Sequence, residues 1–206
     1  MWLNAIITVV IGYLLGNVNG AVVTSKLQGD DVRTHGSGNA GLTNFIRSYG
    51  AGKSALVICI DAGKALLSCL IGGLLMKEFI DFQTGAAMGG AAVMLGHTLP
   101  VFLDFHGGKG ILSGLFIAIM VDWRIALMIL AVFALAYLIT WYVSLGSVLA
   151  AITFGIGFVV FHNDNLTVML CGILMSVMAT VMHWQNIVRL IKGEERKTNL
   201  FKKDKE

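Results

Sequence analysis

The chain has 206 residues, of which 56% are hydrophobic and only 13% are charged. A soluble domain of this length would carry about 25% charged residues, so the composition excludes an ordinary soluble protein and indicates one domain of linked membrane spans. The net charge of +3 is too small to indicate a nucleic-acid partner.

Uncharged stretches of about 20 residues predict the spans, because that length of helix crosses a bilayer. Residues 1–25 carry no charge and predict a first span, which we expect to be retained because no basic segment or cleavage pattern marks it as a signal peptide. Further spans are expected at about 54–76, 84–99 and 166–182. The third is rich in Gly and Ala, which let helix backbones approach closely in lipid.

Two stretches make the number of spans ambiguous. The apolar run 111–121 has only 11 residues, whereas 125–161 holds 37 residues without a charge. The longer stretch is about right for two spans, with a break expected at 143–147. The total is therefore seven spans if the short run crosses the bilayer, and six if it does not.

The positions of the basic residues favour seven spans. With seven, the loops 26–53 and 97–110, the turn at 144–147 and the C-terminal tail share one side, which carries all the basic residues outside the spans except Lys77 and Arg124. The positive-inside rule then predicts a cytoplasmic tail and an N-terminus outside. We expect 1–206 to be a single transmembrane domain, with 196–206 as a flexible basic tail.

The first polar loop has the composition of a phosphate-binding segment. Three glycines lie within the six residues 36–41, close to Ser37, Asn39, Asn44 and Arg47. Backbone amides turned inward by such a loop bind anions, and an Arg can add a bidentate contact to phosphate. A flexible loop held by polar caps is the alternative.

The second polar loop runs Gly96–Gly110 and ends in Gly107-Gly108-Lys109-Gly110 before an apolar helix. A helix N-terminus after a glycine-rich turn with one Lys is a good anion site. The sequence is not a P-loop, and nothing in it indicates a nucleotide. Taken alone, His97 is more often a hydrogen-bonded residue at a helix end than a catalytic base.

Two further pairs lie three residues apart and so share a helix face: Asp61 with Lys64 inside a span, and His183 with Asn186 at a membrane exit. Charges within spans usually face the bundle interior or a polar cavity. We therefore expect Asp61 and Lys64 to form either a purely structural ion pair or a part of the functional site. For the second pair, an interfacial Trp and basic helix is the simpler alternative.

Several enzyme classes lack support. The chain has no H-E-x-x-H or H-x-x-E-H zinc motif, no G-x-S-x-G elbow, and no His-x-x-x-x-Asp pair. A transporter for an anionic metabolite would also need anion-binding loops, but the predicted polar groups gather on one face and no internal repeat is visible.

Five segments in order resemble the bacterial acyl-phosphate:glycerol-3-phosphate acyltransferase family. They are the first loop 36–44, the D-x-x-K of 61–64, the second loop 96–110, the S-x-x-S of 144–147, and the C-terminal motif 183–195. Departures include Ala40 where a proline is common and His106 where a lysine is frequent. The GSGN, TN, GH and GGKG elements are intact.

The resemblance implies a seven-span membrane enzyme whose active site faces the cytoplasm. Its donor is acyl phosphate, its acceptor is glycerol-3-phosphate, and its product is lysophosphatidic acid, with neither a cofactor nor a metal. An altered phosphorylated acceptor remains an alternative. The predicted catalytic residues are Ser37, Arg47, His97, Lys109, His183 and Asn186. The predicted substrate-binding residues are Gly36, Gly38, Asn39, Thr43, Asn44, Gly107, Gly108, Ser144 and Ser147.

The proton acceptor for the substrate hydroxyl is left open between His97, His183 and a substrate phosphate. No covalent serine intermediate is required, because an acyl phosphate already carries a good leaving group. Holding both substrates together in one site would itself remove much of the activation barrier. The acyl chain is expected between spans, with 89–92 leaving room for it.

Overall fold

The computed structural model describes residues 1–198, and within them it contains helices and no strands. The membrane-type helices are α1 (Trp2–Gly16), α4 (Ala55–Met76), α5 (Phe82–Thr98), α6 (Ile111–Val121), α7 (Trp123–Thr140), α8 (Val143–Phe161) and α9 (Leu166–Met182). Shorter helices are α2 (Gly20–Lys26), α3 (Leu42–Tyr49), α10 (Trp184–Ile191), and the 3₁₀ turns η1 (Val32–Thr34), η2 (Ala51–Lys53) and η3 (Val101–Leu103). The predicted all-helical class is confirmed.

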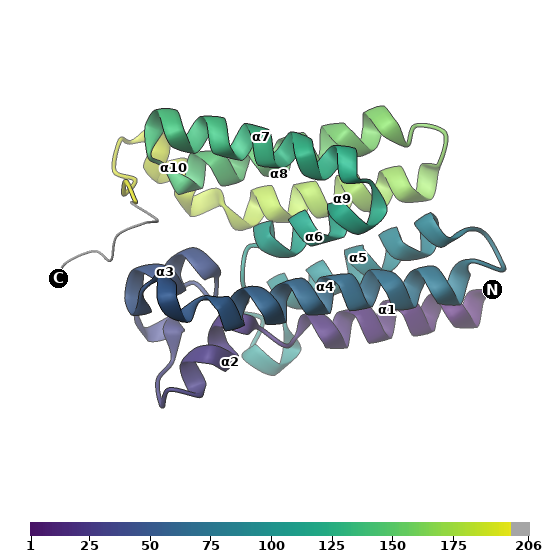
Figure 1. Cartoon of the computed structure of the whole chain (residues 1–206), viewed down its shortest axis with the longest axis horizontal. Helices are drawn as coiled ribbons and strands as arrows, with labels where there is room; N and C mark the ends of the chain where they lie inside the picture. Colours follow the sequence, from purple (N-terminus) through teal and green to yellow (C-terminus); the bar gives the residue numbers. More distant parts are fainter. Residues whose placement is uncertain (199–206) are drawn as a thin grey trace.

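The long helices form two layers with α6 between them (Figure 1). Helices α1, α4 and α5 pack together in one layer, and α7, α8 and α9 in the other, while α6 contacts members of both. Helices α2, α3 and α10 gather at one end of the molecule, and the N-terminus lies at the other (Figure 1). We call the former the loop end.

Four helices in the described part of the chain, α4, α5 with η3, α7 and α8, are long and apolar enough to cross a membrane. The number rises to six if the bent pairs α1–α2 and α9–α10 each count as one span, and α6 is a shorter apolar helix. Large apolar side chains such as Leu135, Leu138 and Ile139 are exposed on the outside of the bundle. This surface is typical of a protein surrounded by lipid.

Asx side chains begin several helices at the end opposite the loop end. Asp81 caps α5 by accepting from Thr84 N at 2.7 Å, and Asp122 caps α7 by accepting from Arg124 N at 3.0 Å. Asn165 caps α9 through Val168 N at 3.2 Å. Each cap satisfies an amide that the helix itself leaves unpaired, so these helices begin where the sequence supplies an Asp or Asn.

Glycines allow very close contacts between the helices of the first layer. A Cβ on Gly72 of α4 would lie 2.2 Å from the carbonyl oxygen of Gly85 on α5. Small residues therefore bring the two backbones together, as the sequence predicted for the third span.

Three expectations about the helices need correction. The first span is broken at 17–19, where Asn19 caps a separate α2 by accepting from Val22 N, and the two parts are bent by 41°. The break between α7 and α8 falls at Trp141, whose φ of 62° is left-handed and ends α7. Ser144 and Ser147 therefore lie in the opening turns of α8, not in the turn between the helices.

The third correction concerns residues 89–92, which do not leave room for an acyl chain. A Cβ on Gly89 would lie 2.3 Å from the backbone oxygen of Ser68, and one on Gly90 would lie 2.6 Å from the Ile117 side chain. These small residues serve helix packing, because the space beside them is already filled by α4 and α6.

Candidate active site

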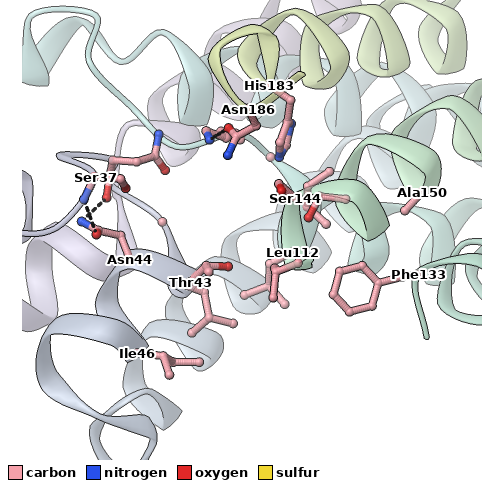
Figure 2. Close-up of a pocket in the computed structure, with 18 of the residues that line it drawn as sticks. Ser37, Thr43, Asn44, Ile46, Leu112, Phe133, Ser144, Ala150, His183 and Asn186 are labelled. Carbon is pink, nitrogen blue, oxygen red and sulfur yellow. Dashed lines mark hydrogen bonds between the residues drawn. The ribbon is translucent and has the colours of Figure 1, made fainter. Parts of the chain in front are cut away.

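A cavity of about 330 Å³ opens at the loop end. Figure 2 shows Ser37 and Asn44 on one side of it, His183 and Asn186 at another, and Ser144, Ala150 and Phe133 across from the loop. Apolar residues from α6, α7 and α8 continue the lining, namely Ile111, Leu112, Leu115, Ile129, Leu130, Phe133, Val143 and Ala150. The cavity therefore joins a polar head to an apolar throat.

Asn44, on α3, organises the first loop. Its Oδ1 accepts from Ser37 N at 2.9 Å, and its Nδ2 lies 3.0 Å from the carbonyl oxygens of Val32, His35 and Asn39. The side chain is buried, and all its hydrogen-bonding groups face the loop backbone. We conclude that Asn44 first holds the loop in shape, since its amide is engaged there.

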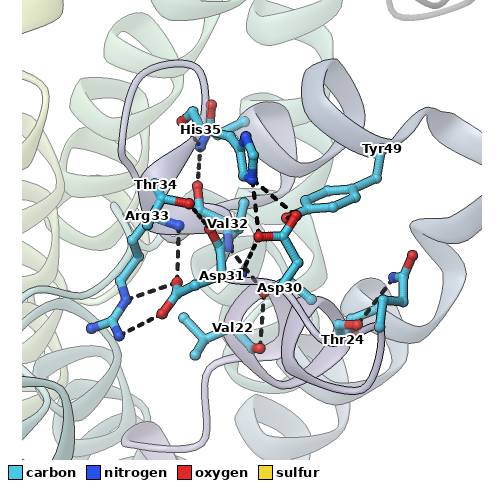
Figure 3. A network of polar contacts seen from close by, with 12 residues as sticks. Val22, Thr24, Asp30, Asp31, Val32, Arg33, Thr34, His35 and Tyr49 are labelled. Carbon is cyan, nitrogen blue, oxygen red and sulfur yellow. Dashed lines mark hydrogen bonds and ion pairs between the residues drawn. The ribbon is translucent and has the colours of Figure 1, made fainter.

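A polar network anchors the segment that precedes this loop (Figure 3). His35 Nε2 lies 2.9 Å from Asp30, and Tyr49 donates to Asp30 at 2.9 Å. Burial and the bond to Asp30 together raise the pKa of Tyr49 to about 12. Arg33 makes two side-chain hydrogen bonds to Asp31 and so holds the pKa of that carboxyl far below its usual range. The network fixes the backbone on which Asn44 acts.

Lys109 lines the cavity just before α6, whose N-cap residue Gly110 has a φ of 81°. Its ammonium donates to Asn186 Oδ1, Asn186 Nδ2 donates to Glu195 at 3.0 Å, and Arg189 donates to Glu195 at 2.7 Å. Burial, followed by the nearby charge of Arg189, lowers the pKa of Lys109 to about 8. A bound anion would therefore meet a partly desolvated cation, where electrostatic attraction is stronger than in water.

A second buried cluster lies at the wall of the cavity, where α4 meets α5. Lys64 Nζ is 2.7 Å from Asp61 Oδ1 and 2.8 Å from His97 Nδ1. Asp61 Oδ1 also accepts from Gly20 N at 3.1 Å, which ties the start of α2 to this cluster. Asp61 and His97 line the cavity. The ion pair predicted within the span is therefore present and contacts a predicted catalytic residue.

The second polar loop folds back over the end of α5. Gly108 N donates to His97 O at 3.0 Å, and a Cβ on Gly108 would lie 2.2 Å from His97 Nε2. A Cβ on Gly107 would lie 2.0 Å from His97 O. Gly107 and Gly108 are not among the residues that line the cavity. They are small so that the loop can pack against the imidazole.

The C-terminal segment crosses the loop end as far as Thr198, within the stretch 196–206 that the sequence predicted as a flexible tail. Thr198 N donates to Trp141 O at 3.1 Å, and Tyr137 OH donates to Thr198 O at 3.1 Å. Arg47 donates to Thr198 Oγ1, and Thr198 is buried. Thr198 is thus docked against the α7–α8 junction by these bonds. The rest of the predicted tail, 199–206, lies outside the described residues.

All six predicted catalytic residues line the cavity, although they come from segments far apart in the chain. Of the predicted substrate-binding residues, Asn39, Thr43, Asn44, Ser144 and Ser147 also line it. Gly36 and Gly38 do not line it, and both adopt positive φ within the first loop. Their place is therefore in the loop backbone.

The sequence did not single out three charged lining residues as site members: Asp61, Arg189 and Glu195. Asp61 was left open as a structural residue, and Arg189 and Glu195 appeared only as parts of a motif. The opposite charges of Arg189 and Glu195, six residues apart, were the only feature of the sequence that could have indicated their contact. A six-residue spacing does not predict a contact on a helix, and here the pair forms because the chain leaves α10 after Ile191.

The fold and cavity together define a polytopic membrane protein with a cationic cavity at one end of its bundle, which continues into an apolar throat. A family model described as glycerol-3-phosphate acyltransferase matches residues 6–193. The chain therefore belongs to the glycerol-3-phosphate acyltransferase family.

Individual relatives agree along nearly the whole chain. The glycerol-3-phosphate acyltransferase of Thermoanaerobacter sp. (strain X514) is 37% identical over 194 residues, which cover 94% of this chain and 95% of the relative. That of Dechloromonas aromatica (strain RCB) is 39% identical over 199 residues, covering 96% and 98%.

Two solved structures share the fold. They are crystal structures of PlsY (YgiH), an integral membrane glycerol 3-phosphate acyltransferase, in a glycerol 3-phosphate form and a lysophosphatidic acid form. Their TM-scores are 0.83 and 0.82 at 33% identity, and each match covers 95% of this chain and 96% of that structure's chain.

Proposed function

We propose that this protein transfers a fatty acyl group from acyl phosphate to the 1-hydroxyl of glycerol-3-phosphate and releases lysophosphatidic acid. The observation that carries the proposal is the cavity, which joins a cationic polar head to an apolar throat. A phosphate group attached to an acyl chain matches both parts. The glycerol 3-phosphate and lysophosphatidic acid forms of the related PlsY support the same acceptor and product.

The polar head is assigned to the phosphate groups of the two substrates. Lys109 and Arg47 offset their charge, and Ser37 and Asn186 donate hydrogen bonds. Arg47 exchanges its bond to Thr198 for a bond to the substrate, and Lys109 does the same with Asn186. Thr43, Ser144 and Ser147 orient the glycerol and the acyl carbonyl from the facing walls of the cavity.

The throat is assigned to the acyl chain, which would run between α6, α7 and α8. A second, much smaller apolar space of about 20 Å³ shares Gly110, Ile111, Ile129 and Ala150 with the main cavity. Burying an acyl chain there contributes roughly 0.8 kcal/mol per methylene group. This binding energy would hold the reacting anhydride in place for attack.

Acyl phosphate is the proposed donor because it reacts without an acyl–enzyme intermediate. The hydroxyl oxygen of the acceptor bonds to the acyl carbon and gives its proton to one of the candidate acceptors, a cavity histidine or a substrate phosphate oxygen. The bond from the acyl carbon to the phosphate oxygen breaks, and phosphate leaves with the electron pair. Its charge is then offset by the cations of the polar head. The family resemblance of the five sequence segments supports this donor.

The proposed topology has seven spans, an outside N-terminus, and a cytoplasmic cavity in the cell membrane, within a single domain. Helix α5 ends at the loop end and α7 begins at the opposite end (Figure 1), so the chain between them traverses the bundle. Helix α6 alone is about 16 Å long at 1.5 Å per residue. Such a short span is tolerated because α6 lies between the two layers of the bundle and is covered by the other helices.

The direct test is an acyl-transfer assay on purified protein with palmitoyl phosphate and labelled glycerol-3-phosphate. Palmitoyl-CoA serves as the competing donor, and Lys109→Ala and Arg47→Ala as variants that should lose turnover. We expect labelled lysophosphatidic acid from acyl phosphate alone. Product from palmitoyl-CoA but not from palmitoyl phosphate would overturn the donor. Wild-type rates in both folded variants would overturn the site assignment.

A further inference from the structure

Lys64 has a complete set of hydrogen-bond acceptors around its ammonium. Asp61 Oδ1 and Val18 O each lie 2.7 Å from Nζ, His97 Nδ1 lies 2.8 Å away, and Gly16 O lies 3.3 Å away. Lys64, Asp61 and His97 are all buried. An ammonium has three hydrogens to donate and no lone pair, so everything around it must accept.

This requirement decides the tautomer of His97. Carboxylate and carbonyl oxygens accept in any case, and Nδ1 of the imidazole must therefore be its unprotonated nitrogen. The proton is assigned to Lys64 because an alkylamine is intrinsically more basic than an imidazole, and because Asp61 Oδ1 and the carbonyl oxygens of Val18 and Gly16 surround Nζ with acceptors. A neutral His97 then carries its single N–H on Nε2.

The ring of His97 lines the cavity, and its Nε2 faces the loop backbone next to Lys109, since a Cβ on Gly108 would approach this atom to 2.2 Å. From this position the N–H can donate to an oxygen of a substrate bound beside Lys109. It cannot take up a proton, because Nε2 already holds one and Nδ1 faces an ammonium.

His183 is fixed in the opposite tautomer. Its Nδ1 lies 2.8 Å from the carbonyl oxygen of Ala179, which can only accept, so Nδ1 carries the proton. The Nε2 lone pair of a neutral His183 is then the hydrogen-bonding atom left to the cavity. Figure 2 shows the ring of His183 pointing into this space towards Ser144.

We propose that Lys64 and the Ala179 carbonyl hold the two cavity histidines in opposite tautomers, so that His97 donates a hydrogen bond to the substrate and His183 accepts one. Lys64 and Asp61 are then positioning residues. His97 is removed as the base for the substrate hydroxyl, and the remaining proton acceptors are His183 Nε2 and a phosphate oxygen. The roles, though not the tautomers, rest on the proposed acyl transfer.

The first test does not depend on turnover. The full chain, labelled with ¹⁵N in its histidine rings, is placed in lipid nanodiscs, and its ring nitrogens are assigned by comparison with His97→Gln and His183→Gln. We expect His97 to show a protonated Nε2 and a bare Nδ1, and His183 the reverse. A protonated Nδ1 on His97, or the same tautomer on both rings, would overturn the proposal.

The second test asks whether His97 donates or accepts. Glutamine places an N–H near the position of Nε2 but cannot act as a base. We expect His97→Gln to keep kcat within about tenfold of wild type, and His97→Ala to lose about 10²–10³-fold. The acid limb of the kcat/KM profile should persist in His97→Gln. His97→Gln as inactive as His97→Ala, with that acid limb gone, would make His97 the base.

Lys64 is tested by a matched pair of variants. Lys64→Gln keeps an N–H donor for Nδ1, whereas Lys64→Met keeps the length of the side chain and removes the donor. We expect Lys64→Met to show mixed tautomers on His97 and a reduced kcat with little change in KM, and Lys64→Gln to restore both in part. The control is His106→Gln. His106 is an exposed histidine in the second polar loop, and this variant should keep wild-type rates. Unchanged tautomer signals in folded Lys64→Met would contradict the positioning role.

Discussion

Lys109 illustrates how one residue changes character on folding. In the sequence it is a single cation in a glycine-rich turn. In the structure, burial and then the nearby charges of Arg189 and Arg47 lower its pKa to about 8, while Glu195 partly offsets them. Such a lysine is still charged at neutral pH but loses its charge within the range where enzymes are assayed.

The pH dependence of the enzyme should therefore carry a signature of Lys109. Because its pKa is lowered, the ammonium is present below about pH 8 and is lost as the pH rises through that value. We expect kcat/KM of the wild type to fall above pH 8, and the fall to move to higher pH in Lys109→Arg, whose guanidinium stays charged. Profiles measured from pH 6 to 10 check this. Identical basic limbs in the two proteins would mean that another group titrates there.

At the scale of elements, contact between helices depends on glycine at a few positions. Gly72 and Gly85 face each other across α4 and α5, and a Cβ on either would lie 2.2 Å from the other's carbonyl oxygen. Gly63 lies on the same helix α4, yet a Cβ there would meet nothing within 4 Å. In the sequence, Gly63 and Gly72 are both glycines within the same apolar helix. Only the packing shows that Gly72 is at a close contact and Gly63 is not.

This difference makes a controlled stability experiment possible. Gly72→Ala should destabilise the protein by about 1–3 kcal/mol, because the two helices must move apart. Gly63→Ala should leave stability unchanged or raise it by up to about 1 kcal/mol, through the helix propensity of alanine. Thermal unfolding of the two variants in the same detergent measures the difference. Equal unfolding temperatures would show that the helices yield at this contact.

Helix α8 has one side towards the cavity and another towards the outside. Ala150 lines the apolar throat, whereas its neighbour Leu149 is exposed on the outer face. We expect Ala150→Phe to fill the throat, and so to lower the rate with palmitoyl phosphate much more than the rate with octanoyl phosphate. Leu149→Phe is the matched control and should leave the chain-length preference unchanged. An unaltered preference in Ala150→Phe would place the acyl chain elsewhere.

At the scale of the whole molecule, the polar groups gather at one end of an otherwise apolar bundle. Helices α2, α3 and α10 lie at that end, and the N-terminus lies at the other (Figure 1). The short helices and loops at the loop end also carry basic residues, namely Lys26, Arg33, Arg47, Lys53 and Lys109. A cytoplasmic loop end satisfies the positive-inside rule and gives a phosphorylated metabolite direct access to the cavity.

A pair of reporters tests this orientation. A fluorescent protein fused after residue 206 should fold and fluoresce in the cytoplasm, and alkaline phosphatase at the same position should be inactive. A tag before residue 1 should be reached by an impermeant reagent on intact cells. A phosphatase that is active at the C-terminus would reverse the orientation, and a C-terminus and N-terminus on the same side would require an even number of spans.

The sequence by itself determined the membrane class, most helix boundaries and the residues of the polar loops. Composition and uncharged length are sufficient for this, because lipid requires apolar side chains over a fixed thickness. The bounds of α6 and α9 were predicted to the residue, and those of α4 and α5 to within two. Where the prediction failed, at 17–19 and 141, a local cap or a left-handed residue interrupts an uncharged run without adding a charge.

Only the tertiary structure decided which of these residues act together. Asp61 and Lys64 were a pair of uncertain purpose until α5 brought His97 to 2.8 Å from Nζ. Asn44 proved to hold the loop, and Thr198 to contact Arg47 from 151 positions away. Side-chain spacing along one helix predicts local faces, but contacts between distant segments depend on how the helices pack. For that reason the proton positions on His97 and His183 follow from the folded site alone.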